Sequence, residues 1–301
     1  MRQIVLTNQY NDRLEGEFIK LFHELKIPLR SNRRGRKGFS NYQRFSVTAL
    51  FARSRKSLRD FINQFHESKW AKWLQLSKIP SKSTIYNWLS LFSMKIIRKI
   101  NKLLNSNSPS LTAIDGTGFD SHHRSRHYEK RVGFSKMPYA KADLFVDLST
   151  KKIIDFSLVN KHQHDIVAGR EFVKRNDLNG VTILCDGAYD CEDFHKSIVD
   201  KGGKLYAPVR KRNKRSLKRF PKGWFRKQCL KLPDFMGKRS IIEAVNSCLK
   251  RRFIISLRSK SDFTKEIEFG WAILVYNLDR KLMEKNEDTQ KKITFFILIL
   301  I

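Results

Sequence analysis

Two short apolar runs that each end in Asp-Gly constrain the fold of this chain most strongly. LTAIDG ends in Asp115 and Gly116, and VTILCDG ends in Asp186 and Gly187. Such runs predict buried strands, and α/β sheets present their functional groups at the carboxyl ends of strands. An aspartate at a strand end is often only a turn former. Two aspartates in the same setting, on strands that we expect to be sheet neighbours, favour a shared site.

The residues around these two runs predict an α/β order with a mixed sheet. YAKADLFVDLS and KIIDFSLV alternate as neighbouring antiparallel strands do, and KLYAPV predicts a short last strand. DIVAGREFVKR and DCEDFHKSIVDKG predict helices, with Asp165 as the N-cap of the first and a glycine ending the second. The resulting order is strand, strand, strand, helix, strand, helix, strand.

A helical domain is expected before the sheet, over residues 1–105. YQRFSVTALFARSRKSLRDFINQF has apolar residues at helical spacing. Pro80 is predicted to end one helix and Ser83 to cap the next, Thr84–Leu91. This pair suggests a helix-turn-helix, although a plain helical hairpin fits the spacing equally well. The polar segment NSNSPS marks the boundary to a second domain, 106–301, which carries a basic insert at 207–236.

The charge of the chain indicates a polyanionic partner. Its 61 Lys and Arg against 29 Asp and Glu give a net charge of +32. An anionic membrane surface is an alternative partner. In the segment RKRNKRSLKRFPKGWFRKQ, residues 210–228, aromatic residues lie between the basic ones, which suits phosphate contact and base stacking. We expect DNA contacts from Arg210, Lys211, Arg212, Lys214, Arg215 and Trp224. The basic segment 29–40 is also expected to contact phosphate.

The cysteines and the chain ends bear on the compartment. The four cysteines form no CxxC pair, so reduced thiols in a cytoplasmic protein are expected. Charges interrupt the first residues, so no signal peptide is expected. The apolar end Ile293–Ile301 is far shorter than the roughly 20 residues of a membrane-spanning helix. It predicts a buried last strand or an aberrant end left by truncation or frameshift, with a membrane anchor as the third alternative.

A single acid stands in the basic stretch KRSIIEAVNSCLKRRF, which predicts an amphipathic helix with Glu243 opposite the apolar face. The simplest interpretation is a surface pair with Arg239, four residues earlier, worth about 0.2–0.5 kcal/mol. The alternative is a third carboxylate for the site of Asp115 and Asp186. Three carboxylates suit Mg²⁺ or Mn²⁺, and two such ions about 4 Å apart support phosphodiester chemistry. The basic surroundings are expected to keep these acids ionised.

The histidines do not predict a zinc site. SHHRSRH places His122, His123 and His127 in a basic loop, and no cysteine stands at ligand spacing. DNA contact or simple solvation is expected for them.

Strand–Asp, strand–Asp and helix–Glu in this order resemble the RNase H-like catalytic core of DDE transposases from prokaryotic insertion sequences. Arg239, Glu243 and Lys250 match the R-(3)-E-(6)-K part of a Y-(2)-R-(3)-E-(6)-K signature, whereas Met236 stands at the tyrosine position. DGAYD is similar to the family's second-Asp motif, IPSKSTIYNWL to its amino-terminal helical segment and EIEFGWAILVYNLDR to the closing helix of its core. The resemblance covers nearly all of residues 40–282.

This resemblance implies Mg²⁺-dependent (or Mn²⁺-dependent) cleavage of DNA at transposon ends, followed by strand transfer. The implied catalytic and metal-binding residues are Asp115, Asp186 and Glu243, with two ions, and Arg239, Asn246 and Lys250 are implied to contact DNA. A homodimer on paired DNA ends, in the cytoplasm with the nucleoid, is also implied. The alternatives are an RNase H-like nuclease that cuts without joining and a catalytically inactive DNA-binding relic.

Overall fold

The computed structural model describes most of the chain, with side chains between residues 11 and 284, over residues 8–30, 38–105, 108–120, 139–160, 163–210 and 221–299. The chain divides into two compact units, one of Met1–Leu104 with Gly270–Ile301 and one of Asn105–Phe269. Residues 270–301 therefore group with the amino-terminal helices, whereas the sequence predicted a single second domain over 106–301.

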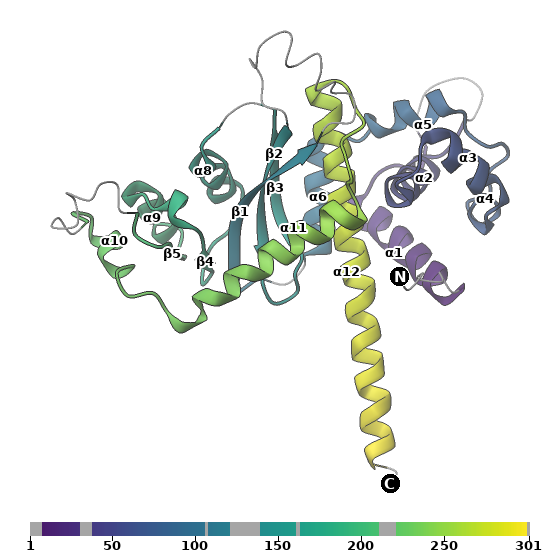
Figure 1. Ribbon diagram of the computed structural model, residues 1–301. Helices are drawn as coiled ribbons and strands as arrows, with labels where there is room; N and C mark the ends of the chain where they lie inside the picture. The colour runs from purple at the N-terminus through teal and green to yellow at the C-terminus, as the bar shows by residue number, and fades with distance from the viewer. Residues whose placement is uncertain are drawn as a thin grey trace. The chain divides into compact units, whose positions relative to one another are not determined.

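Helices make up the first unit, as the sequence predicted (Figure 1). Its core gathers aromatic side chains: Phe45 lies 5.7 Å from Phe18 and 5.8 Å from Trp271 between ring centroids. These aromatic contacts join the first helices to the last one. The helices are α1 (Asn8–Leu25), α2 (Asn41–Ser54), α3 (Leu58–Glu67), α4 (Lys69–Trp73), α5 (Lys82–Leu89), α6 (Met94–Leu104) and the part of α12 (Asp262–Ile299) from Gly270 onward.

The predicted helix boundaries around Pro80 are wrong. Helix α4 ends at Trp73, so Pro80 does not end a helix. Helix α5 begins before the predicted Thr84, and its N-cap is Ser81, whose hydroxyl accepts a hydrogen bond from the Thr84 backbone N–H. This bond satisfies one of the backbone N–H groups that the first turn of a helix leaves without a partner. The helix-turn-helix itself stays a prediction.

A five-stranded mixed sheet forms the centre of the second unit, in the order β3-β2-β1-β4-β5. Strands β1, β2 and β3 pair antiparallel, whereas β4 and β5 continue the sheet parallel to β1. The predicted strand order, the antiparallel pair and the neighbourhood of the two Asp-Gly strands are thereby confirmed. The strands are β1 (Leu111–Asp120), β2 (Tyr139–Asp147), β3 (Ile153–Val159), β4 (Thr182–Leu184) and β5 (Lys204–Tyr206).

Helices cover both faces of this sheet (Figure 1). On one face, Ile114 and Phe145 join a buried cluster with Phe172 of α8 (Asp165–Arg175) and residues of α9 (Glu192–Val199). On β1 the next residue, Asp115, contacts α11 (Ser240–Arg252). Because successive strand residues point to opposite faces, α8 and α11 lie on opposite sides of the sheet.

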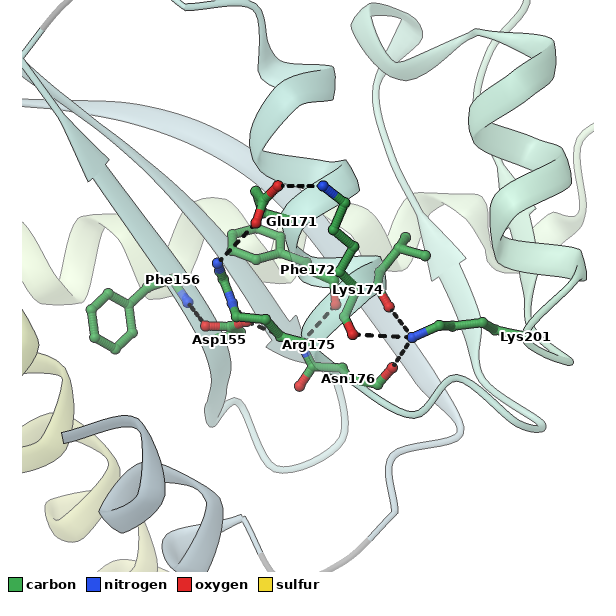
Figure 2. Close-up of polar contacts among 9 residues, drawn as sticks. Asp155, Phe156, Glu171, Phe172, Lys174, Arg175, Asn176 and Lys201 are labelled. Atoms are coloured by element: carbon green, nitrogen blue, oxygen red, sulfur yellow. Dashed lines mark hydrogen bonds and ion pairs between the residues drawn. The ribbon is translucent and has the colours of Figure 1, made fainter. Parts of the chain in front are cut away.

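The carboxyl end of α8 is fastened to the sheet by a polar network (Figure 2). Asp155 of β3 accepts hydrogen bonds from Arg175 Nε at 2.8 Å and from Asn176 Nδ2 at 3.0 Å. Lys201 Nζ donates to the backbone carbonyls of Lys174 and Asn176, where α8 has no further turn to satisfy them. Helix α8 is therefore held to β3 at its carboxyl end.

Two further expectations about helix ends are wrong. The apolar tail was expected to form a buried strand or to be an aberrant end, and the strand is wrong because α12 continues as a helix to Ile299. The N-cap of α8 is His164, and Asp165 is the first helical residue, because the Asp165 carboxylate pairs with Lys141 of β2 and caps no backbone N–H. All four cysteines are free thiols, in line with the prediction, and Cys185 and Cys229 are buried.

No helix in the described part of the chain is both long and apolar enough to cross a membrane.

Phe172→Ala is expected to destabilise the sheet unit by about 3–5 kcal/mol, because it removes a buried ring that stacks on Phe145 at 6.1 Å and leaves a cavity. Equilibrium denaturant unfolding measures this free energy. Val167→Ala on the same helix is the control: this side chain is exposed, so a change within about 0.5 kcal/mol is expected. Equal effects of the two substitutions would contradict the assigned core.

Candidate active site

Asp115 lies within β1, five residues before its end, and not at the strand end that the sequence predicted. The reason is that β1 has a different partner on each side. Its parallel pairing with β4 stops at Ala113↔Leu184, whereas its antiparallel pairing with β2 continues to Asp120↔Tyr139. Asp115 therefore lies on β1 two residues beyond the last residue that pairs with β4.

Asp186 follows β4 by two residues and caps a short 3₁₀ helix, η1 (Gly187–Tyr189). One oxygen of its carboxylate, Oδ1, accepts a hydrogen bond from the Ala188 backbone N–H at 2.8 Å. The sequence predicted Asp186 at the carboxyl end of an apolar strand, and the structure places it two residues beyond the end of β4. Since β1 and β4 are adjacent, Asp115 and Asp186 lie at the same edge of the sheet.

Glu243 lies on the first turn of α11, with its side chain 60% exposed. Arg239 Nη2 donates to Glu243 Oε1 at 3.2 Å, which is the simple surface pair considered above. The same guanidinium has its Nη1 3.9 Å from Asp115 Oδ1. Arg239 thus lies between two acids from different elements, a tertiary contact that a surface pair alone does not require.

Asn246 adds a second contact between α11 and β1. Its Nδ2 donates to Asp115 Oδ2 at 3.4 Å, and the residue is only 7% exposed. Among the residues that the structure describes, Asn246 Oδ1 is buried without a hydrogen-bond partner. Helix α11 and its N-cap residue Arg239 therefore present one amide and one cation to the Asp115 carboxylate.

Burial raises the pKa of Asp115 from 3.8 to about 6. Arg239 acts in the opposite direction, whereas Asp186 and Glu243 add repulsion and raise the pKa further. The basic neighbours therefore do not lower the pKa of this acid, because desolvation outweighs the attraction of one partly exposed guanidinium, although a carboxyl with a pKa of about 6 is still mostly ionised at neutral pH. Asp186 and Glu243 thus each lie close enough to Asp115 to repel its carboxylate.

The donor set fits a hard divalent cation in its chemistry. Carboxylates that repel one another, together with the Asn246 amide oxygen, are the ligand types that Mg²⁺ and Mn²⁺ prefer. In the described residues no group of three or more His, Cys, Asp or Glu side chains is arranged to hold a metal ion. The cation next to Asp115 and Glu243 is the guanidinium of Arg239.

Sequence reasoning missed a second acidic cluster behind Asp115. Asp143 of β2 is the register partner of Gly116, and its side chain is fully buried. Lys141 Nζ lies 3.2 Å from Asp143 Oδ1, forms an ion pair with Asp165 and donates to the Gln163 carbonyl at 2.9 Å. This cluster joins β2 to the start of α8 on the sheet face opposite to Arg239.

Gly116 leaves room for that cluster. A side chain at this position would begin 3.0 Å from Asp143 Oδ1 and 3.4 Å from Asp165 Oδ1. A glycine permits such a close approach, and the groups that approach here are these two acids. The signal in the sequence was Lys141 and Asp143 two residues apart in the otherwise apolar strand YAKADLFVD, which puts both on one buried face.

The residues predicted to contact DNA are spread over this unit. Lys250 Nζ lies 5.6 Å from the ring centroid of Phe119, Arg210 is exposed, and Trp224 is 65% exposed. Their DNA contacts stay predictions. Lys211, Arg212, Lys214, Arg215, His122, His123, His127 and most of the basic segment 29–40 lie outside the described residues.

A mixed five-stranded sheet covered by helices, with acids on β1, after β4 and on α11, defines an RNase H-like DDE core that follows an amino-terminal helical region. The model of the transposase DDE domain matches residues 106–278, more than half of the chain, and the chain belongs to this family.

Among solved structures, the chain is similar to one titled cryo-EM structure of piggyBac transposase synaptic complex with hairpin DNA. The two share 13% sequence identity, with a TM-score of 0.47, over 93% of this chain and 74% of that one. No curated protein sequence matches the chain significantly.

Asp143→Asn is expected to change how stability depends on pH. Burial raises the pKa of Asp143 from 3.8 to about 6, so between these values the folded protein holds a proton that the unfolded chain loses. Stability therefore falls as pH rises through this window, by up to about 3 kcal/mol. The amide does not titrate, so the variant should gain about 1–3 kcal/mol relative to the wild type between pH 4 and pH 7.

Denaturant unfolding at pH 4, 5, 6 and 7 measures this difference. Asp200→Asn, on an exposed aspartate after α9, is the control and should show no comparable trend. A constant difference between the Asp143 variant and the wild type at all four pH values would contradict the raised pKa.

Proposed function

We propose that this protein is a transposase of insertion-sequence type, which cleaves phosphodiester bonds at transposon ends and joins the ends to target DNA. The contact of Arg239 with both Asp115 and Glu243 carries this proposal. It connects the R-(3)-E-(6)-K motif of α11 to the aspartate of β1, although the two are far apart in the sequence. Membership of the transposase DDE domain family supports the same function.

Asp115, Asp186 and Glu243 are the proposed catalytic residues and the proposed ligands of two divalent ions, Mg²⁺ or Mn²⁺. When bound, such ions activate a water or a 3′-hydroxyl and stabilise the leaving oxygen of the phosphodiester. The repulsion of Asp115 by Asp186 and Glu243, which adds to the desolvation that raises its pKa, supports this assignment, since a bound cation relieves such repulsion. Asn246 orients the Asp115 carboxylate through its amide N–H.

Arg239 and Lys250 are the proposed phosphate contacts next to these acids. A guanidinium that already bonds a carboxylate has the fork geometry that suits a phosphate as well. Lys250 lies on the same helix, and Phe119 contacts its ammonium. Asn246 is largely buried, so any DNA contact it makes is proposed to act through its position beside Asp115.

The proposed partner is DNA, both the transposon ends and the target. The net charge of +32 and the segment 210–228, with Arg210, Lys211, Arg212, Lys214, Arg215 and Trp224, support it. The amino-terminal helices, with α5 as the second helix of a helix-turn-helix, are proposed to bind DNA too. A homodimer that holds two ends, in the cytoplasm with the nucleoid, completes the proposal.

Asp115→Asn, Asp186→Asn and Glu243→Gln are each expected to lower cleavage of an end-containing duplex at least about a hundredfold, because each removes a charged ligand. Binding of the same duplex in EDTA should persist in all three variants. Gel assays with Mg²⁺ measure cleavage, and fluorescence anisotropy measures binding. Glu171→Gln on α8, an exposed acid away from these groups, is the matched control and should cleave normally. Unchanged cleavage in the three variants would exclude the assignment.

Joined products distinguish a transposase from a nuclease on the same core. The wild-type protein, incubated with end-containing duplex, a supercoiled target plasmid and Mg²⁺, is expected to give covalent end–target products besides nicks. Nicks without joined products would favour the nuclease. Neither product, with DNA binding intact, would favour the inactive DNA-binding relic.

A further inference from the structure

The carboxylate of Asp190, four residues after Asp186, binds residues near both ends of the basic segment 210–228. Its side chain is fully buried. Arg226 donates to it through two nitrogens, Nε to Oδ1 at 2.7 Å and Nη2 to Oδ2 at 2.6 Å. The backbone N–H of Arg210 donates to Oδ2 at 2.8 Å. A bidentate arginine pair with an additional backbone donor is among the strongest polar contacts of a protein.

A second acid holds the same region. Glu192, the first residue of α9, accepts hydrogen bonds from the backbone N–H groups of Phe225 at 3.0 Å and Arg226 at 3.1 Å, at the start of α10 (Trp224–Gln228). Gly223 makes this possible, because a side chain there would overlap the Glu192 carboxylate. The carboxyl end of the basic segment is thus bound to α9 by its backbone as well as by its arginine.

These contacts hold a strongly basic segment in place near both of its ends. Between Arg210 and Arg226 the sequence contains seven Lys and Arg residues. Trp224, two residues before Arg226, is 65% exposed. Asp190 belongs to the same short turn as Asp186. The 3₁₀ helix η1 separates the two residues, and the Asp190 backbone N–H donates to the Gly187 carbonyl. A displacement of Asp190 therefore moves the turn that carries Asp186.

We propose that Asp190 is a positioning residue that anchors the basic segment 210–228 to the Asp186 turn, so that DNA held by this segment is presented to the candidate catalytic acids. The inference rests on the proposed function and extends it, since nothing in the motif around Glu243 involves Asp190. Arg226, Glu192 and Gly223 complete the anchor.

The charge of Asp190 makes the test decisive. An acid among DNA-binding cations repels phosphate, so by charge alone Asp190→Asn should tighten DNA binding. Loss of the anchor predicts the opposite: the Kd for an end-containing duplex in EDTA should rise about three- to tenfold. Asp200→Asn removes the same charge from an exposed site on the end of α9 and is the matched control, with binding unchanged or slightly tighter.

Two further variants reach the anchor without changing the net charge. Gly223→Ala displaces Glu192, and Arg226→Lys keeps the cation but removes the fork. Both are expected to weaken DNA binding in the same direction as Asp190→Asn, and Arg226→Lys should retain more binding than Arg226→Ala. Trypsin should cut within 210–228 faster in these variants than in the wild type, while circular dichroism remains native.

Cleavage at saturating DNA supplies a readout that a purely structural contact would leave unchanged. The anchor predicts a lower turnover for Asp190→Asn in folded protein, besides the higher Kd. If Asp190→Asn does not fold, Gly223→Ala and Arg226→Lys decide the question.

Wild-type or tighter DNA binding together with unchanged tryptic cleavage in these variants would overturn the anchor. Binding and proteolysis are measured without metal, so these results do not depend on catalysis. If the three acid variants of the proposed active site cleave normally while the anchor variants lose DNA binding, the proposed function fails and the anchor stands.

Discussion

The parallel pairing of β1 with β4 is the contact on which the candidate site depends. It extends only from Leu111↔Thr182 to Ala113↔Leu184, and Thr112 Oγ1 donates to the Thr182 carbonyl at 3.0 Å within it. Through this register the turn that carries Asp186 lies beside the segment of β1 that carries Asp115. A register shift by one residue would turn Asp115 to the opposite face, away from α11.

Three acids near the candidate site have basic partners, two of them from distant parts of the chain and one from the same strand. Arg239 reaches Asp115, Lys141 reaches Asp143, and Arg226 reaches Asp190. Burial favours the protonated form of Asp115 and Asp143, so these partners offset a desolvation cost more than they add stability. The same contacts connect strands and helices that the apolar core alone would hold less specifically.

Local patterns in the sequence predicted the sheet and most of its helices correctly, because they depend on periodicity that neighbouring residues share. The alternation in YAKADLFVDLS gave the antiparallel strand β2, and the spacing of apolar residues gave α8 and α11. Predictions failed where a partner decided the outcome. Asp115 lies inside β1 because β2 extends the pairing, and Asp165 is no N-cap because Lys141 holds its carboxylate.

The sequence alone determined which residues approach one another along a helix: Arg239 and Glu243 are four residues apart on consecutive turns, so their contact follows from helix geometry. Only the tertiary structure decided that Arg239 also reaches Asp115, that Asp143 lies behind Gly116, and that Asp190 joins Arg210 to Arg226. These contacts link residues far apart in the chain, and they exist only once strand register and helix packing bring the elements together. No spacing within a single segment encodes that arrangement.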